Sequence, residues 1–329
     1  MAAGHNGWRA LPWYLQLPAR VLTLRDAVGL GRTVARAAAL PLAERQGGKP
    51  SILTTRSVPG AVEVQQVRVP TRSGSVAVRT YRASGSPGQL PVLLFIHGGG
   101  WIMGGLDGAE PLCRRLALSA GVAVVSIDYR LAPEHPFPAG LEDCADVLEW
   151  VRASGDQLGL DPERIGVSGD SAGGNLSAAL TLLDRDARHP LLAQVLIYPG
   201  LDLTMSSPYF ETFRGPGLTR QSCRELVALY LGPERDRRDP LVSPLHAADL
   251  AGLPPALVIT GGADILADDG ARYVARLVAD GTPAALRHYP RAPHAFLAFD
   301  RLVPESTQAF EEIAAFVRGQ LATAGSVAR

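Results

Sequence analysis

The sequence is poor in the residues that mark several common classes of protein. It has three cysteines, Cys113, Cys144 and Cys223, which are widely spaced and form no CxxC pair. Such a set suits a reducing compartment and fits neither a disulfide framework nor a zinc site. We therefore interpret the cysteines as packing residues. The only lysine, Lys49, is followed by Pro50, which excludes a phosphate-binding loop because that loop needs Gly-Lys before Ser or Thr.

An excess of charge and long apolar runs are absent as well. The 32 basic and 32 acidic residues give a formal net charge of zero, so no overall field favours nucleic acid or an anionic membrane. No stretch reaches about 18 consecutive apolar residues, which predicts no membrane span. Pro12 and Trp13 interrupt the N-terminus where an export signal needs an apolar run. Without H-E-x-x-H or a Cys/His cluster, we expect no metal and no other cofactor. These observations predict a cytoplasmic protein with a small-molecule partner.

From residue 62 onward, strand-like and helical patterns alternate. A period-two pattern over 62–81 predicts an antiparallel hairpin. Short apolar runs, typical of buried parallel strands, follow and are separated by helical patterns. The runs cover 92–96, 122–127, 165–167, 195–198, 257–260 and 286–289, and the helical patterns cover about 110–120, 140–153, 172–185, 268–280 and 305–321. We predict an α/β fold with a mostly parallel central sheet flanked by helices.

Two segments depart from this alternation and predict a helical cap. Residues 21–42 have the pattern of amphipathic helices. A second segment, rich in Pro, Ser and Arg, is too long for a simple connection. The predicted division is 1–50, N-terminal cap helices; 51–200, first part of the core; 201–245, cap insertion; and 246–329, second part of the core. Candidates for the substrate pocket, if they do not simply pack the cap together, are Trp13, Trp101, Met205, Phe210 and Phe213.

A glycine-rich turn links the strand at 165–167 to the next helix. It reads Gly-Asp-Ser-Ala-Gly-Gly over 169–174, which contains the G-x-S-x-G pattern of a nucleophile elbow. The glycines at 169 and 173 permit a turn so tight that Ser171 is held in a strained conformation at its tip. An ordinary glycine-rich turn is the alternative, which the strand before and the helix after disfavour. Ser171 is therefore the candidate nucleophile.

Three successive glycines follow the strand at 92–96 and begin after His97. Their backbone N–H groups are unshielded, so Gly98 and Gly99 can point two donors at an oxyanion, and Ala172 can supply a third. A nucleotide-binding loop would need a G-x-G-x-x-G register, which is not found. We interpret His97 as a structural histidine hydrogen-bonded to backbone.

A serine hydroxyl needs a general base, and His294 has the most suitable context of the seven histidines. It follows the last strand, at the edge where a doubly wound sheet presents its binding crevice. The orienting acid should follow a strand between nucleophile and histidine, where three aspartates compete. We favour Asp264, which is nearest the strand end, whereas Asp268 or Asp269 is well placed to cap the next helix.

Several motifs together resemble the hormone-sensitive-lipase-like family of bacterial carboxylesterases, over about residues 90 to 300. They are HGGGW at 97–101, DYRLAPEHPFPA at 128–139, GDSAGG at 169–174, D-x-L-x-D at 264–268 and H-x-F at 294–296. The resemblance implies an α/β-hydrolase fold, a cap of N-terminal helices plus an insertion after the sixth strand, ester substrates with short to medium chains, and a homodimer. Ile265 and Ala295 stand where the family usually has proline and glycine, which puts only local loop geometry in doubt.

The leading hypothesis is a serine carboxylesterase in which Ser171 attacks an ester carbonyl, His294 transfers the proton and Asp264 orients the imidazole. One alternative is a non-catalytic binding module, because plant gibberellin receptors resemble this family but lack the catalytic histidine. The presence of His294 argues against it. Another alternative keeps the same machinery but cleaves amides or removes acetyl groups from a particular metabolite. The sequence leaves that alternative open.

Overall fold

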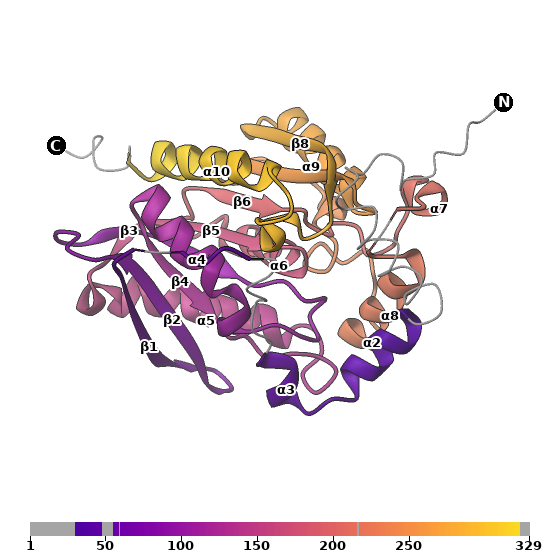
Figure 1. The fold of residues 1–329 in the computed structure, drawn as a ribbon, viewed down its shortest axis with the longest axis horizontal. Coiled ribbons are helices and arrows are strands. Elements are labelled where there is room, and N and C mark those ends of the chain that lie inside the picture. Colours follow the sequence, from indigo (N-terminus) through magenta and orange to yellow (C-terminus); the bar gives the residue numbers. More distant parts are fainter. Residues whose placement is uncertain (1–29, 48–54, 59, 216, 323–329) are drawn as a thin grey trace.

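An eight-stranded sheet forms the centre of the molecule (Figure 1), in a computed structural model that describes residues 30–47, 55–58, 60–215 and 217–322. The strands are β1 (Val62–Thr71), β2 (Gly74–Ala83), β3 (Leu90–Ile96), β4 (Ala123–Ile127), β5 (Leu160–Asp170), β6 (Gln194–Ile197), β7 (Ala256–Ala263) and β8 (Ala284–Pro293). Their order in the sheet is β1-β2-β4-β3-β5-β6-β7-β8. β1 and β2 form the predicted antiparallel hairpin, β2 pairs antiparallel with β4, and the remaining pairs are parallel.

Helices cover both faces of this sheet, as predicted. The larger ones are α4 (Leu106–Ala120), α5 (Ala139–Ser154), α6 (Ala172–Asp184), α9 (Ala267–Ala279) and α10 (Glu305–Ala322), and short 3-10 turns are η2 (Gly155–Leu158), η3 (Pro244–His246) and η4 (Phe296–Phe299). Among the described residues, no helix combines the length and the hydropathy needed to cross a bilayer.

The alternation of side chains along β3 explains why helices are needed on both sides. Leu93 and Phe95 are fully buried in one apolar cluster with residues of α4 and α10. Val92, Leu94 and Ile96 point to the opposite face and are fully buried with residues of α5 and α6. Since successive side chains on a strand face opposite sides, a continuous apolar run can be stable only between two helical layers. The predicted α/β-hydrolase fold is confirmed.

A helical cap lies beyond the end of the sheet where β5 meets α6. It contains α2 (Leu30–Ala38), α3 (Leu42–Gln46), α7 (Tyr209–Thr212) and α8 (Arg220–Leu231). Helices α2 and α8 are far apart in the sequence but lie side by side (Figure 1), where Val34 packs with Leu226 and Leu229. The described part of the N-terminal segment therefore packs against the insertion, and the predicted domain boundaries stay a prediction.

Candidate active site

Ser171 lies at the tip of the turn between β5 and α6, with a φ of 55° and a ψ of −116°. A non-glycine residue rarely adopts a positive φ, so the turn stores the predicted strain. The flanking glycines are sterically required. A Cβ added at Gly173 would lie 1.9 Å from the Ile96 carbonyl oxygen, and one at Gly169 would lie 2.3 Å from the Gly173 carbonyl oxygen. The elbow therefore forms because these positions carry no side chain.

The structure brings Ser171, His294 and Asp264 together from three different strand ends. His294 Nε2 lies 2.9 Å from Ser171 Oγ, and His294 Nδ1 lies 2.8 Å from Asp264 Oδ2. Since an ionised carboxylate can only accept, the Nδ1–H donates to Asp264 and leaves Nε2 free to accept from the serine hydroxyl. Asp264 is fully buried, and its Oδ1 accepts a hydrogen bond from the Leu266 N–H at 3.0 Å.

Two carboxylates set the electrostatic environment of His294. Burial alone would lower the pKa of the imidazole, but the charge and hydrogen bond of Asp264, with the charge of Asp170, raise that pKa above its ordinary value of 6.5. The environment therefore stabilises the imidazolium, the form that a general base acquires during acyl transfer.

The glycine loop after β3 presents different donors from those expected. The Gly98 N–H donates to Asp170 Oδ1 at 2.8 Å, so it is not available to an oxyanion, which corrects the prediction for Gly98. Gly99 and Gly100 adopt positive φ values of 118° and 61°. Within the described chain, the N–H groups of Gly99, Gly100 and Ala172 have no protein acceptor, and all three residues line the same cavity.

His97 and Asp170 both contact Gly98 and so hold this loop in place. His97 Nδ1 lies 2.8 Å from the Gly98 carbonyl oxygen, and its ring stacks on Tyr129 with centroids 4.4 Å apart. Burial lowers the pKa of His97 to about 4, so the ring stays neutral at physiological pH. Burial also raises the pKa of the Asp170 carboxyl to about 6. The predicted structural role of His97 agrees with these contacts.

Sequence reasoning missed Arg45, which anchors the far end of the same loop. Its guanidinium, from α3, is fully buried and donates from Nη1 to the carbonyl oxygens of Ile102 at 2.6 Å and Ala132 at 2.8 Å. It also pairs with Glu134, and its own carbonyl oxygen accepts the Gly104 N–H at 3.0 Å. No local pattern distinguishes this arginine from its neighbours, because its two partner segments, 102–104 and 132–134, are distant in sequence.

A cavity of about 280 Å³ opens beside Ser171 and His294 and is lined mainly by apolar side chains. Three predicted pocket residues, Trp101, Met205 and Phe210, line it. Phe213 does not line the cavity. Its half-buried ring instead packs near Tyr209, with the two ring centroids 5.5 Å apart. Trp13 lies outside the described residues. Of the apolar side chains that sequence reasoning missed, Met103 and Leu266 come from loops of the core, and others come from the cap, among them Val34, Leu218, Leu226 and Val227. In residues 30–47, 55–58, 60–215 and 217–322, no group of three or more His, Cys, Asp or Glu could hold a metal ion.

The other two aspartates after β7 do not cap α9, so that expectation was wrong. The N-cap position of α9 is Leu266, and no side chain caps it. Asp269 instead turns into the core, where its Oδ2 accepts the N–H groups of Leu201 at 3.0 Å and Asp202 at 3.1 Å. Burial raises the pKa of Asp269 to about 8.

The two departures from the family pattern have local effects only. Ile265 is buried in the apolar core. Ala295 has a φ of 60°, a conformation that glycine adopts without cost, so alanine carries a small strain there. His294, immediately before it, still reaches both partners.

The chain is similar to proteins of known class. A family model described as alpha/beta hydrolase fold matches residues 93–298. Carboxylesterase NlhH of Mycobacterium tuberculosis is 42% identical over 240 residues, which are 71% of this chain and 75% of that protein. Carboxylic ester hydrolase LipN of the same organism is 40% identical over 269 residues, 79% of this chain and 71% of that protein. A hyperthermophilic esterase from the archaeon Pyrobaculum calidifontis aligns with a TM-score of 0.79 and 34% identity, covering 94% of this chain and 98% of that one.

The fold and the site together define a hydrolase of the α/β class. More narrowly, the chain belongs to the hormone-sensitive-lipase-like family of carboxylic ester hydrolases. The resemblance drawn from the five sequence motifs is thereby confirmed, and so is the predicted enzyme class.

Proposed function

We propose that this protein hydrolyses carboxylic esters through an acyl-enzyme intermediate formed on Ser171. The observation that carries this proposal is the continuous hydrogen-bonded line from Ser171 Oγ through His294 to Asp264, with distances of 2.9 and 2.8 Å. Ser171 Oγ attacks the ester carbonyl carbon while His294 Nε2 takes the hydroxyl proton. His294 then gives this proton to the leaving alkoxide. A water molecule, activated in the same way, releases the acid.

The negative charge of the tetrahedral intermediate develops on the former carbonyl oxygen. The N–H groups of Gly99, Gly100 and Ala172 are the donors proposed to receive it, because all three lack a protein acceptor and line the cavity beside Ser171. Such preorganised donors stabilise an oxyanion more than a ground-state carbonyl. Asp170 contributes indirectly, since it binds the Gly98 N–H and so fixes the loop that carries two of the donors.

The proposed substrates are esters with short to medium acyl chains. A mostly apolar cavity of about 280 Å³, walled by the cap, supports this class, and the esterase and carboxylesterase names of the relatives agree with it. Apolar walls bind a hydrocarbon chain by excluding water and make no demand on its polar groups.

The test is a hydrolysis panel of p-nitrophenyl esters of rising acyl length, with p-nitroanilides of the same acids as controls. We expect measurable turnover of the shorter esters, a decline for long chains, and far slower cleavage of the anilides. Ser171→Ala should remove the activity without changing the melting temperature. Preferential cleavage of the anilides, or substantial turnover by Ser171→Ala, would contradict the proposal.

A further inference from the structure

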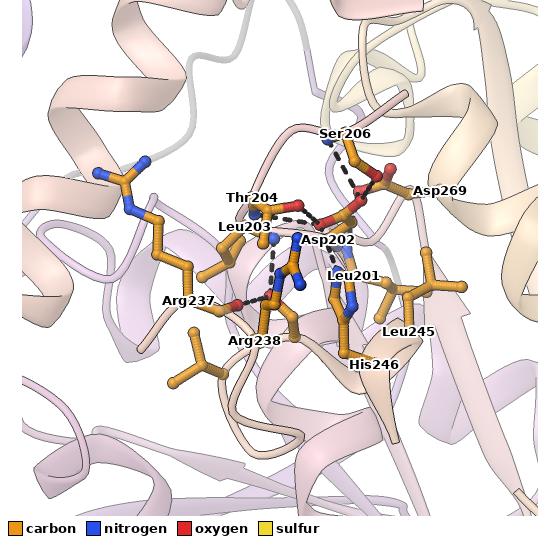
Figure 2. A network of polar contacts seen from close by, with 12 residues as sticks. Leu201, Asp202, Leu203, Thr204, Ser206, Arg237, Arg238, Leu245, His246 and Asp269 are labelled. Atoms are coloured by element: carbon orange, nitrogen blue, oxygen red, sulfur yellow. Dashed lines mark hydrogen bonds and ion pairs between the residues drawn. The ribbon is translucent and has the colours of Figure 1, made fainter. Parts of the chain in front are cut away.

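The chain leaves the core for the cap insertion through a tight turn that is organised by Asp202. Its buried carboxylate accepts the backbone N–H groups of Thr204 at 3.1 Å and Ser206 at 3.3 Å, and both hydroxyl groups as well (Figure 2). His246 Nε2, 3.0 Å away, and Arg272 Nη1, 3.1 Å away, complete the shell. Burial would raise the pKa of Asp202, but these hydrogen bonds and charges hold it well below its ordinary value, so the group is ionised.

Met205 lies between the two residues that Asp202 holds. Its φ is 56°, a backbone conformation that residues other than glycine rarely adopt. Its N–H donates to the Asp202 carbonyl oxygen at 3.0 Å, and its side chain is buried and lines the cavity beside Ser171. Since both neighbours are bound to one carboxylate, the backbone of Met205 is held in the conformation that places its side chain in the cavity wall.

The turn is also tied to the core and to the returning end of the insertion (Figure 2). Asp269, from α9, accepts the N–H groups of Leu201 and Asp202 through a single oxygen, Oδ2. The Leu203 N–H donates to Ser243 Oγ at 2.8 Å. The backbone of Asp202 is therefore held in place, and a change at its carboxylate should affect residues 204–206 rather than the sheet.

We propose that Asp202 is a positioning residue for substrate selection, which holds Met205 in the pocket wall and so limits the length of the acyl chain that the enzyme accepts. This inference rests on the proposed ester-hydrolase function. Asp202 itself also lines the cavity beside Ser171, but it does not touch the reacting atoms in this account. Its effect passes through the main chain of Thr204 and Ser206 to the side chain between them.

The kinetic test compares Asp202→Asn and Met205→Ala, singly and together, on the p-nitrophenyl ester series. Both single variants should raise the ratio of kcat/KM for long over short acyl chains, by about tenfold for Met205→Ala, which is the lower end of what one methylene is worth in a hydrophobic pocket. The double variant should not exceed Met205→Ala, because both act on one side chain. Asp249→Asn is the matched control, since that carboxylate is exposed and, in the part of the chain that the structure describes, pairs with Arg185 and its local backbone alone.

A second readout does not depend on turnover. The chain has only three methionines, Met1, Met103 and Met205, so methyl-labelled methionine gives three NMR signals, and Met205→Ala assigns one of them. Asp202→Asn should shift or broaden the Met205 signal more than the Met103 signal. If Asp202→Asn does not fold, Thr204→Val and Ser206→Ala each remove one hydroxyl donor and should give smaller changes in the same direction.

Two results would overturn the inference: an Asp202→Asn profile that falls by one common factor for every ester, or a Met205 signal that is unchanged in the folded variant. Failure of the proposed function looks different. In that case the wild-type protein would hydrolyse none of the esters, whereas the NMR comparison would still report whether Asp202 positions Met205.

Discussion

The reacting groups and the pocket wall are built in different ways. Ser171, His294 and Asp264 each follow a strand of one rigid sheet, and the short motif around each residue determines its local turn. The pocket wall is assembled from segments far apart in the sequence. α2 packs on α8 through apolar side chains such as Val34 and Leu226, the turn at 201–206 is organised by the buried carboxylate of Asp202, and Arg45 of α3 ties the cap to the loop after β3. The proposed catalytic residues are therefore encoded by local motifs, whereas the pocket wall depends on contacts between distant segments.

The largest effect should come from replacing Asp264, the proposed orienting acid. Asp264→Asn should leave the fold intact but lower kcat by about 10⁴-fold, because the amide favours the wrong imidazole tautomer. Asp268→Asn is the matched control, since its side chain is outside the hydrogen-bonded line and does not cap α9. Steady-state kinetics and melting temperatures of both variants provide the measurement. A near-normal kcat for Asp264→Asn beside a collapsed one for Asp268→Asn would show that the wrong carboxylate was chosen.

A smaller loss is expected when the oxyanion loop is displaced. A Cβ at Gly99 would lie 2.0 Å from the Met103 carbonyl oxygen, so Gly99→Ala must move the loop. Loss of one donor typically costs ~10² to 10³ in kcat, with less effect on KM. Gly85→Ala shares a positive φ of 76° but has open space around it, which makes it the control for backbone strain. A change confined to KM would instead indicate that Gly99 shapes the acyl pocket.

Breaking the contact between the two regions should have an intermediate effect. Arg45→Met leaves the carbonyl oxygens of Ile102 and Ala132 without their donor, at a cost of about 1 to 3 kcal/mol in the free energy of unfolding for each buried unpaired group. The loop shift should lower kcat by up to ~10²-fold. Arg36→Met, an exposed arginine in the same cap segment, is the control. Equal melting temperatures and kcat values for the two variants would refute the anchoring role.

The smallest effect concerns pH. The base is active when neutral, so activity should fall as the pH drops through the pKa of His294, which lies above 6.5. Asp170→Asn removes a charge that raises this pKa and keeps an acceptor for Gly98, so the acid limb of kcat/KM should move to lower pH. A pH profile of both proteins measures the shift. An unchanged or higher midpoint would contradict this electrostatic assignment.

The same division explains what could be predicted from the sequence. The strands, the larger helices and the three residues of the hydrogen-bonded line from Ser171 to Asp264 were accessible because apolar periodicity and glycine spacing are local signals. Gly98 was misassigned because its N–H partner, Asp170, lies 72 residues away. Asp269 was misread as a cap because its real partners are backbone groups beyond β6. Phe213 looked like a pocket residue only by its apolar character. The expected homodimer and the cytoplasmic location stay predictions.

The central claim, that Ser171 carries the acyl group, is tested most directly by trapping the intermediate. The enzyme is mixed with excess p-nitrophenyl butyrate and quenched in acid within the first turnovers, and the intact protein and its peptides are then weighed by mass spectrometry. We predict the added mass of one butyryl group on the peptide that contains Ser171, and none in Ser171→Ala. A butyryl group on another residue, or undiminished turnover by Ser171→Ala, would contradict the account.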